Sequence, residues 1–128
     1  MTKLFALIIE DDPKLNLILD TALQQMGFET GIDSRGDQYQ SILANRIPAL
    51  VILDLHLPYA SGKEIHKLLR ANPSFKDTLI IITTADIFLA KKLEKEAEIV
   101  LTKPVSVGRL KMIIDQRWPV IAKARKVR

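Results

Sequence analysis

Short, uninterrupted apolar runs recur along the chain and alternate with segments of helical periodicity. The three clearest runs are residues 4–9, 49–53 (ALVIL) and 78–82 (TLIII). Strands that are continuously apolar, rather than alternating with polar residues, are typical of a sheet covered by helices on both faces. Regular alternation of strand and helix indicates βα units with right-handed crossovers. We therefore predict an α/β fold, a (βα)5 doubly wound five-stranded parallel sheet.

Two weaker strands and five helices complete this pattern. We expect the weaker strands at residues 28–32 and 98–101. Apolar residues at helical spacing, bounded by turn and capping residues, predict the helices. Their expected ranges are 14–26, 37–45, 61–71, 86–96 and 106–117. The last helix either continues past Pro119 or breaks there.

The composition indicates one folded domain and excludes several classes of protein. The chain has 128 residues, of which 48% are hydrophobic and 27% charged, enough for a single domain with its own core. It has no cysteine, which excludes a disulfide framework and a cysteine-based zinc site. No run approaches the roughly 20 apolar residues of a membrane span. The first apolar run is short and ends in acid, so we expect no signal peptide and a cytoplasmic protein.

The net charge of +4 is unevenly distributed along the chain. Residues 109–128 hold seven basic residues and one acidic residue, whereas residues 1–108 hold twelve basic and fourteen acidic residues. We expect a domain at residues 1–118 and a basic C-terminal tail, or the start of a linker, at residues 119–128. The tail is either a solvated segment or a contact for acidic protein, nucleic acid or lipid.

Polar residues follow the predicted strands at the points where they end. In a parallel sheet these ends meet at one edge, outside which ligands bind. Clustered carboxylates repel one another but suit a hard cation such as Mg²⁺. A carboxylate can also accept a phosphoryl group, which lysine and a threonine hydroxyl can then bind. The residues are Glu10, Asp11, Asp12, Asp54, Thr83, Thr84 and Lys103.

Four motifs at these strand ends resemble the response regulator receiver domain of two-component signalling. They are IIEDDP, VILDLHLPYASG, IIITTA and LTKP, and the resemblance covers about residues 3–117. It implies the flavodoxin-like strand order 2-1-3-4-5 of chemotaxis receivers. It also implies a Mg²⁺-dependent switch in a phosphorelay, phosphorylated by a sensor histidine kinase or a phosphotransfer protein.

The same resemblance implies a role for each site residue. Asp54 corresponds to the phosphoacceptor, Thr84 to the hydroxyl that responds to phosphorylation and Lys103 to the phosphate-binding lysine. The Lys103–Pro104 bond is cis in many receivers. The implied metal ligands are Glu10, Asp11, Asp54 and the backbone carbonyl of His56.

Other functions remain open at this point. A receiver-like interaction module that is never phosphorylated would be a binding protein. A phosphatase with an aspartyl nucleophile generally has a second acid two residues later, where this chain has His56. We expect a signalling domain whose only catalysis is slow self-dephosphorylation, with no DNA-binding domain in this chain and with an unknown downstream target.

Several local features carry expectations of their own. Asp12 is predicted to cap a helix N-terminus, and Gly62 to relax the backbone at the start of another helix. We expect His66 on a helix surface, and His56 at the mouth of the site without acting as a base. Receivers commonly carry an aromatic residue three positions before the lysine, but this chain has Val100 there.

Overall fold

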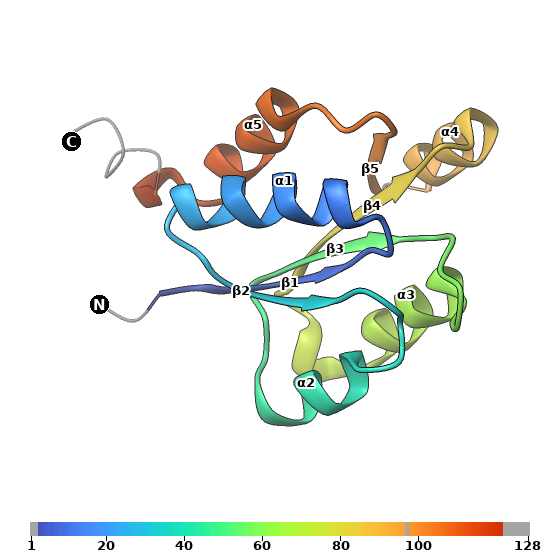
Figure 1. Cartoon of the computed structure of the whole chain (residues 1–128), viewed down its shortest axis with the longest axis horizontal. Coiled ribbons are helices and arrows are strands. Elements are labelled where there is room, and N and C mark those ends of the chain that lie inside the picture. The colour runs from blue at the N-terminus through green and yellow to red at the C-terminus, as the bar shows by residue number, and fades with distance from the viewer. Residues whose placement is uncertain (1–2, 97, 122–128) are drawn as a thin grey trace.

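The computed structural model describes residues 3–96 and 98–121. Its centre is a single parallel sheet in the order β2-β1-β3-β4-β5 (Figure 1). Both the predicted fold class and the predicted strand order are confirmed. The strands are β1 (Phe5–Ile9), β2 (Glu29–Asp33), β3 (Leu50–Asp54), β4 (Leu79–Thr84) and β5 (Ile99–Thr102).

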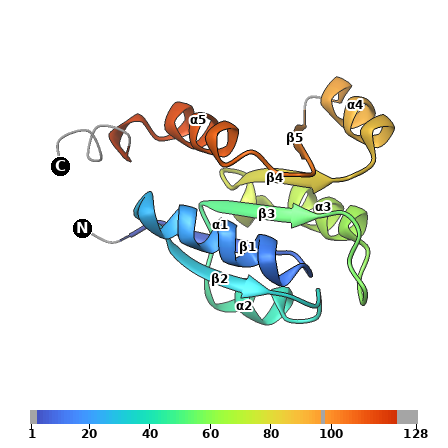
Figure 2. The same cartoon turned by 45° about the horizontal axis from the view of Figure 1, so that its top comes forward.

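Helices cover both faces of the sheet. In Figures 1 and 2, α1 and α5 lie on one face, and α2 and α3 lie on the other. Helix α4 packs Ala90 into the same core as α3. The helices are α1 (Pro13–Gln25), α2 (Tyr39–Asn45), α3 (Gly62–Ala71), α4 (Ile87–Lys95) and α5 (Val107–Arg117), with a 3-10 turn, η1, at Pro73–Phe75.

The apolar strands supply two cores because successive strand residues point to opposite faces. One core, beneath α1 and α5, receives Ile8, Ile52 and Leu101. The other, toward α2, α3 and α4, receives their neighbours in the strands, among them Val100. Every residue of β1 and β3 is buried, which explains why these strands read as continuous apolar runs.

Four helices begin at a residue whose side chain caps the first turn. The Asp12 carboxylate accepts a hydrogen bond from the backbone N–H of Lys14, which confirms the predicted cap. The same arrangement occurs at the starts of α3, α4 and α5. The capping residues there are Ser61, Asp86 and Ser106.

Helix α2 begins later than the sequence predicts. It was expected from residue 37 but starts at Tyr39. The buried carboxylate of Asp33 accepts hydrogen bonds from four backbone N–H groups of the preceding loop and of Tyr39 itself. These bonds hold the loop in a turn, and so the helix cannot start within it.

The end of α5 decides between the two alternatives for the last helix. The helix ends at Arg117, and Trp118 has a non-helical backbone (φ −131°, ψ 76°). A residue before proline is disfavoured in a helix, which accounts for the break before Pro119. The Lys103–Pro104 bond is cis, as the family resemblance implies. Most of the basic tail lies outside the described residues, and no described helix has the length and apolarity to cross a membrane.

Candidate functional site

Three carboxylates converge at the carboxyl edge of the sheet. Glu10 and Asp11 follow β1, and Asp54 ends the neighbouring strand β3. Each offers a carboxylate oxygen within 4.8 Å of the others. Glu10 and Asp54 are buried, whereas Asp11 is exposed. The structure therefore brings the side chains of the three acids predicted for metal binding into one cluster, open to solvent at Asp11.

Lys103 completes this cluster from the other side of the site. Its Nζ lies 2.9 Å from Oε1 of Glu10 and 3.2 Å from Oδ2 of Asp54. One lysine cannot neutralise three ionised carboxylates, so the fully ionised cluster carries a net negative charge. Oxygen ligands with an excess of negative charge are what a hard divalent cation requires. The residues present therefore fit Mg²⁺.

The cluster shifts the pKa values of its own members. Burial raises the pKa of Glu10 to about 7, and hydrogen bonds from Lys103 and the Asp12 backbone oppose this rise only in part. Burial lowers the pKa of Lys103, but its contacts with Glu10 and Asp54 raise it above the ordinary value. Burial also raises the pKa of Asp11, but the neighbouring Glu10 and Asp54 carboxyl groups lower it to below the ordinary value.

Asp54 is held from two directions. Its Oδ1 accepts a hydrogen bond from the backbone N–H of His56 at 3.0 Å, and its Oδ2 accepts one from Lys103. The first residue of α3, Gly62, packs directly beneath it. A Cβ atom at this position would overlap the carbonyl oxygen of Asp54 and the Cα of Leu55. The prediction for Gly62 was wrong in its reason, because this close approach requires glycine, not a special backbone conformation.

Thr84 is buried at the end of β4, where the sequence predicts the responsive hydroxyl. Its Oγ1 accepts a hydrogen bond from the backbone N–H of Asp86 at 3.1 Å and lies 3.4 Å from Nε2 of His56. Asp86 is the N-cap of α4, so the hydroxyl is connected to the start of that helix. The His56 side chain is exposed, as expected for a residue at the mouth of the site.

His66 lies apart from this site and corrects a second expectation. It was expected on a helix surface, but its side chain is mostly buried between α3 and the start of β5. Its Nε2 lies 3.1 Å from Oε1 of Glu98, whose other oxygen accepts a hydrogen bond from Arg70 at 3.3 Å. Glu98, directly before β5, therefore binds to α3 through a charged contact.

Asn16 is a residue of the site region that sequence reasoning missed. Its Nδ2 donates a 2.7 Å hydrogen bond to the backbone carbonyl of Glu10, and this contact is buried. The signal was available, because Asn16 occupies a buried position of α1 at helical spacing from Leu19 and Leu23. A polar residue on an apolar helix face requires a hydrogen-bond partner.

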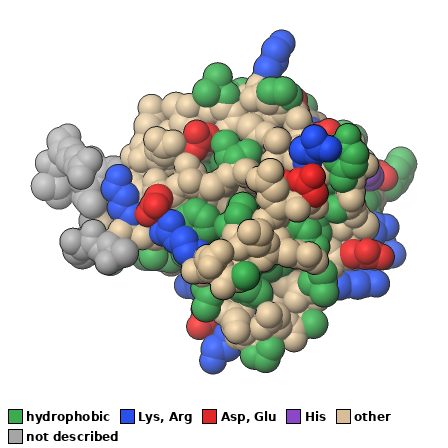
Figure 3. Space-filling model, turned by 60° about the horizontal axis from the view of Figure 1, so that its bottom comes forward, with side chains coloured by type: hydrophobic (Ala, Val, Ile, Leu, Met, Phe, Trp, Pro, Cys, Tyr) green, Lys and Arg blue, Asp and Glu red, His purple; other side chains and the backbone are tan. Residues whose placement is uncertain are grey.

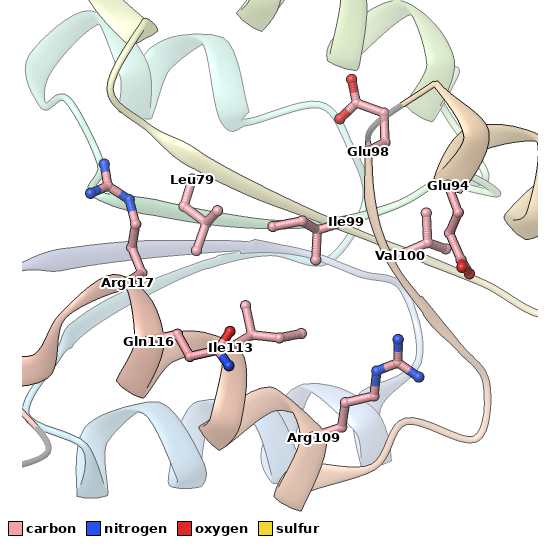
Figure 4. Close-up of a pocket in the computed structure, with 9 residues that line it drawn as sticks. All are labelled: Leu79, Glu94, Glu98, Ile99, Val100, Arg109, Ile113, Gln116 and Arg117. Carbon is pink, nitrogen blue, oxygen red and sulfur yellow. The ribbon is translucent and has the colours of Figure 1, made fainter.

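Two hollows lie away from the acidic cluster. One has a volume of about 550 Å³ and lies between α4, β5 and α5 (Figure 4). It is lined by Leu79, Glu94, Glu98, Ile99, Val100, Arg109, Ile113, Gln116 and Arg117. The other, of about 620 Å³, lies between α2 and α3 and is mostly apolar. The surface in Figure 3 shows hydrophobic side chains interspersed with charged ones.

Comparisons with known sequences agree on one family. A family model described as the response regulator receiver domain matches residues 6–115. A probable chemotaxis protein CheY of Rhizobium etli is 32% identical over 118 residues, which cover 88% of this chain and 91% of that protein. The phosphate regulon transcriptional regulatory protein PhoB of Rhizobium meliloti is 38% identical over 78 residues, 61% of this chain. The chain covers 34% of the length of that regulator.

A comparison with solved structures identifies the same fold. The receiver domain of a Pseudomonas aeruginosa sensor histidine kinase matches with a TM-score of 0.76 and 20% identity, covering 90% of this chain and 97% of that chain. That receiver was solved with a magnesium ion coordinated in its active site cleft. At this level of identity the likeness shows the fold alone.

Proposed function

The chain belongs to the response regulator receiver domain family, and we propose that it is a Mg²⁺-dependent switch phosphorylated on Asp54. The observation that carries this proposal is the buried carboxylate of Asp54, in contact with Lys103 and clustered with two further acids. A receiver-like module that is never phosphorylated would not need to retain this set of residues. The phosphoryl donor would be a sensor histidine kinase or a phosphotransfer protein.

In the proposed reaction, Asp54 is the nucleophile. One of its carboxylate oxygens attacks the phosphorus of a phosphohistidine, and a P–O bond forms as the P–N bond breaks. The imidazole nitrogen of the donor keeps the electron pair of the broken bond. The hydrogen bond from the His56 backbone and the contact with Lys103 orient the carboxylate for this attack. Lys103 also places positive charge next to the oxygens of the incoming phosphoryl group.

The acidic cluster would hold the cation that this reaction requires. Glu10, Asp11 and Asp54 supply carboxylate oxygens, and we assign a further ligand to the backbone carbonyl of His56. When bound, Mg²⁺ would neutralise negative charge on the transferring phosphoryl group. The Pseudomonas receiver of the same fold was solved with a magnesium ion in its active site cleft, so the fold can hold this cation.

Thr84 would connect phosphorylation to a change in shape. The phosphoryl group adds a charge near −2 and strong acceptor oxygens, to which the Thr84 hydroxyl can donate. That hydroxyl contacts His56 and accepts a hydrogen bond from the N-cap residue of α4, Asp86. A shift of Thr84 toward the phosphoryl group would loosen both contacts and move the start of α4. Such a switch is a signalling function, with slow self-dephosphorylation as its only catalysis.

Phosphorylation by a small-molecule donor tests the proposal directly. Acetyl phosphate with Mg²⁺ should add one phosphoryl group, measured by intact mass, and chelation of Mg²⁺ should prevent the addition. Asp54→Asn should abolish the reaction, whereas the nearby helix cap variant Asp12→Asn should retain it. Undiminished phosphorylation of Asp54→Asn would refute the assignment of the acceptor, and a parent protein that is never phosphorylated would favour the interaction module.

A further inference from the structure

The hydroxyl of Thr83 has no role in the proposed reaction and no hydrogen-bond partner among the described residues. Thr83 has no exposed surface, so water does not reach the hydroxyl from outside. The hydroxyl of the adjacent Thr84, in contrast, accepts a hydrogen bond from Asp86. Two neighbouring threonines therefore end β4, one with its hydroxyl in use and one with its hydroxyl free.

The register of the sheet places Thr83 next to Asp54. Thr83 on β4 pairs with Asp54 on β3 and with Leu101 on β5. Register partners on neighbouring parallel strands point to the same face, and the strands lie about 4.8 Å apart. Leu101 packs into the core beneath α1 and α5. Thr83 and Asp54 therefore lie side by side on this face of the sheet.

The side chain of Lys103 also reaches this part of the sheet edge. Lys103 follows β5, yet its Nζ contacts Asp54 at the end of β3. Because β4 lies between β3 and β5, the lysine side chain must cross the end of β4, where Thr83 lies. Thr83, the second-last residue of β4, therefore lies close to the path of this lysine side chain.

A buried hydroxyl without a partner lowers the stability of a folded protein. Valine has nearly the same shape as threonine and would fill this position at no such cost. Groups that lower stability in this way are concentrated at functional sites. Thr83 therefore has the properties of a donor whose acceptor is present only in another state of the protein.

We propose that the Thr83 hydroxyl is a second donor to the phosphoryl group, used only when Asp54 is phosphorylated. Phosphorylation adds strong acceptor oxygens to the side chain that lies beside Thr83. The hydroxyl then gains a partner that it lacks in the unphosphorylated protein, which favours the phosphorylated state. This inference rests on the proposed function, because it requires Asp54 to be the acceptor.

Binding of beryllofluoride, a phosphoryl mimic, in the presence of Mg²⁺ tests the inference. Thr83→Val should melt at a higher temperature than the parent without ligand, because it removes an unpaired buried hydroxyl. The same variant should bind beryllofluoride about tenfold more weakly, the effect of losing one hydrogen bond to a charged group. Thr83→Ser, which keeps the hydroxyl, should bind within about twofold of the parent.

Thr78→Val is the matched control. Thr78 is also buried and stands directly before β4, but its hydroxyl donates a 2.7 Å hydrogen bond to the carbonyl of Pro48. Its replacement should lower the melting temperature and leave beryllofluoride affinity unchanged. If Thr83→Val binds beryllofluoride as tightly as the parent, the inference is overturned. If the parent itself fails to bind, the proposed function fails instead, so the two failures are distinguishable.

Discussion

Two clusters of charge in this protein differ in how far they are removed from water. At the carboxyl edge of the sheet, Lys103 contacts the almost completely buried carboxylates of Glu10 and Asp54. At the hollow of Figure 4, which Glu98 helps to line, Glu98 contacts Arg70, whose side chain is 42% exposed. Water screens the second contact but largely not the first. Burial, not the number of charges, therefore determines where substitutions and protons have large effects.

Two glycines, one beneath the buried cluster and one at the start of α5, differ in how closely other atoms approach them. This difference gives the largest expected effect. Gly62→Ala would force a Cβ atom into the backbone beneath Asp54, so we expect a loss of about 3 kcal/mol in the free energy of unfolding. Gly108→Ala, at the start of α5, meets only Ser106 Oγ at 3.8 Å and should stabilise the protein by about 0.5–1 kcal/mol. Urea unfolding measures both. Equal effects at the two positions would contradict the close packing beneath Asp54.

Removal of the two basic partners gives the next largest difference. Lys103→Met leaves two buried carboxylates without their cation and should cost about 2 kcal/mol of stability. Arg70→Met removes a partly exposed partner and should cost less than about 1 kcal/mol. Addition of Mg²⁺ should recover part of the first loss and none of the second. Urea unfolding with and without Mg²⁺ measures both losses. Equal losses in the two variants would contradict the larger role of the buried contact.

A further effect is expected from pH, and between pH 5 and pH 8 it should arise mainly from Glu10 in the buried cluster. The pKa of Glu10 is raised from 4.5 to about 7 in the folded protein. Between these two values the folded state holds a proton that the unfolded state has released, so stability falls as pH rises through this window. The pKa shifts of Asp11 and Lys103 affect stability outside this window, below pH 3.8 and above pH 10.5 respectively.

The comparison of Glu10→Gln with the parent isolates this contribution. Without Mg²⁺, the parent should lose more stability than Glu10→Gln between pH 5 and pH 8, as measured by urea unfolding. Because protons and Mg²⁺ compete for the carboxylate, the parent's Mg²⁺ affinity should also rise over the same range. Parallel stability curves for the two proteins would show that Glu10 does not titrate in this window.

The smallest expected effect concerns how changes at the acidic cluster reach the hollow between α4, β5 and α5. Val100 lines the hollow of Figure 4 and occupies a position at which receivers commonly carry an aromatic residue. Its β-branched side chain has no large ring to rotate. We expect beryllofluoride to increase amide exchange protection after Asp54 and Thr84, with little change near Val100 and α5. Hydrogen exchange measures this directly. Large changes spread over Val100 and α5 would mean that another residue performs the role of the aromatic.

Sequence reasoning succeeded where one physical pattern dominated. Continuous apolar runs predicted the strands, and the polar residues that end them predicted a cluster of Glu10, Asp11 and Asp54. It was wrong where a specific polar contact of one side chain decided the outcome. The start of α2 depends on hydrogen bonds to Asp33, and the partial burial of His66 depends on Glu98.

The sequence by itself therefore determined the layers of this protein and the edge of the sheet at which its acidic cluster lies, because hydrophobic periodicity and strand ends are local properties of the chain. Only the tertiary structure decided which residues of different elements lie next to one another. Gly62 lies against Asp54 because α3 packs back onto β3, and Thr83 lies beside Asp54 because the two strands pair in one register. Contacts between residues far apart in the chain depend on the packing of whole elements, which no local pattern encodes.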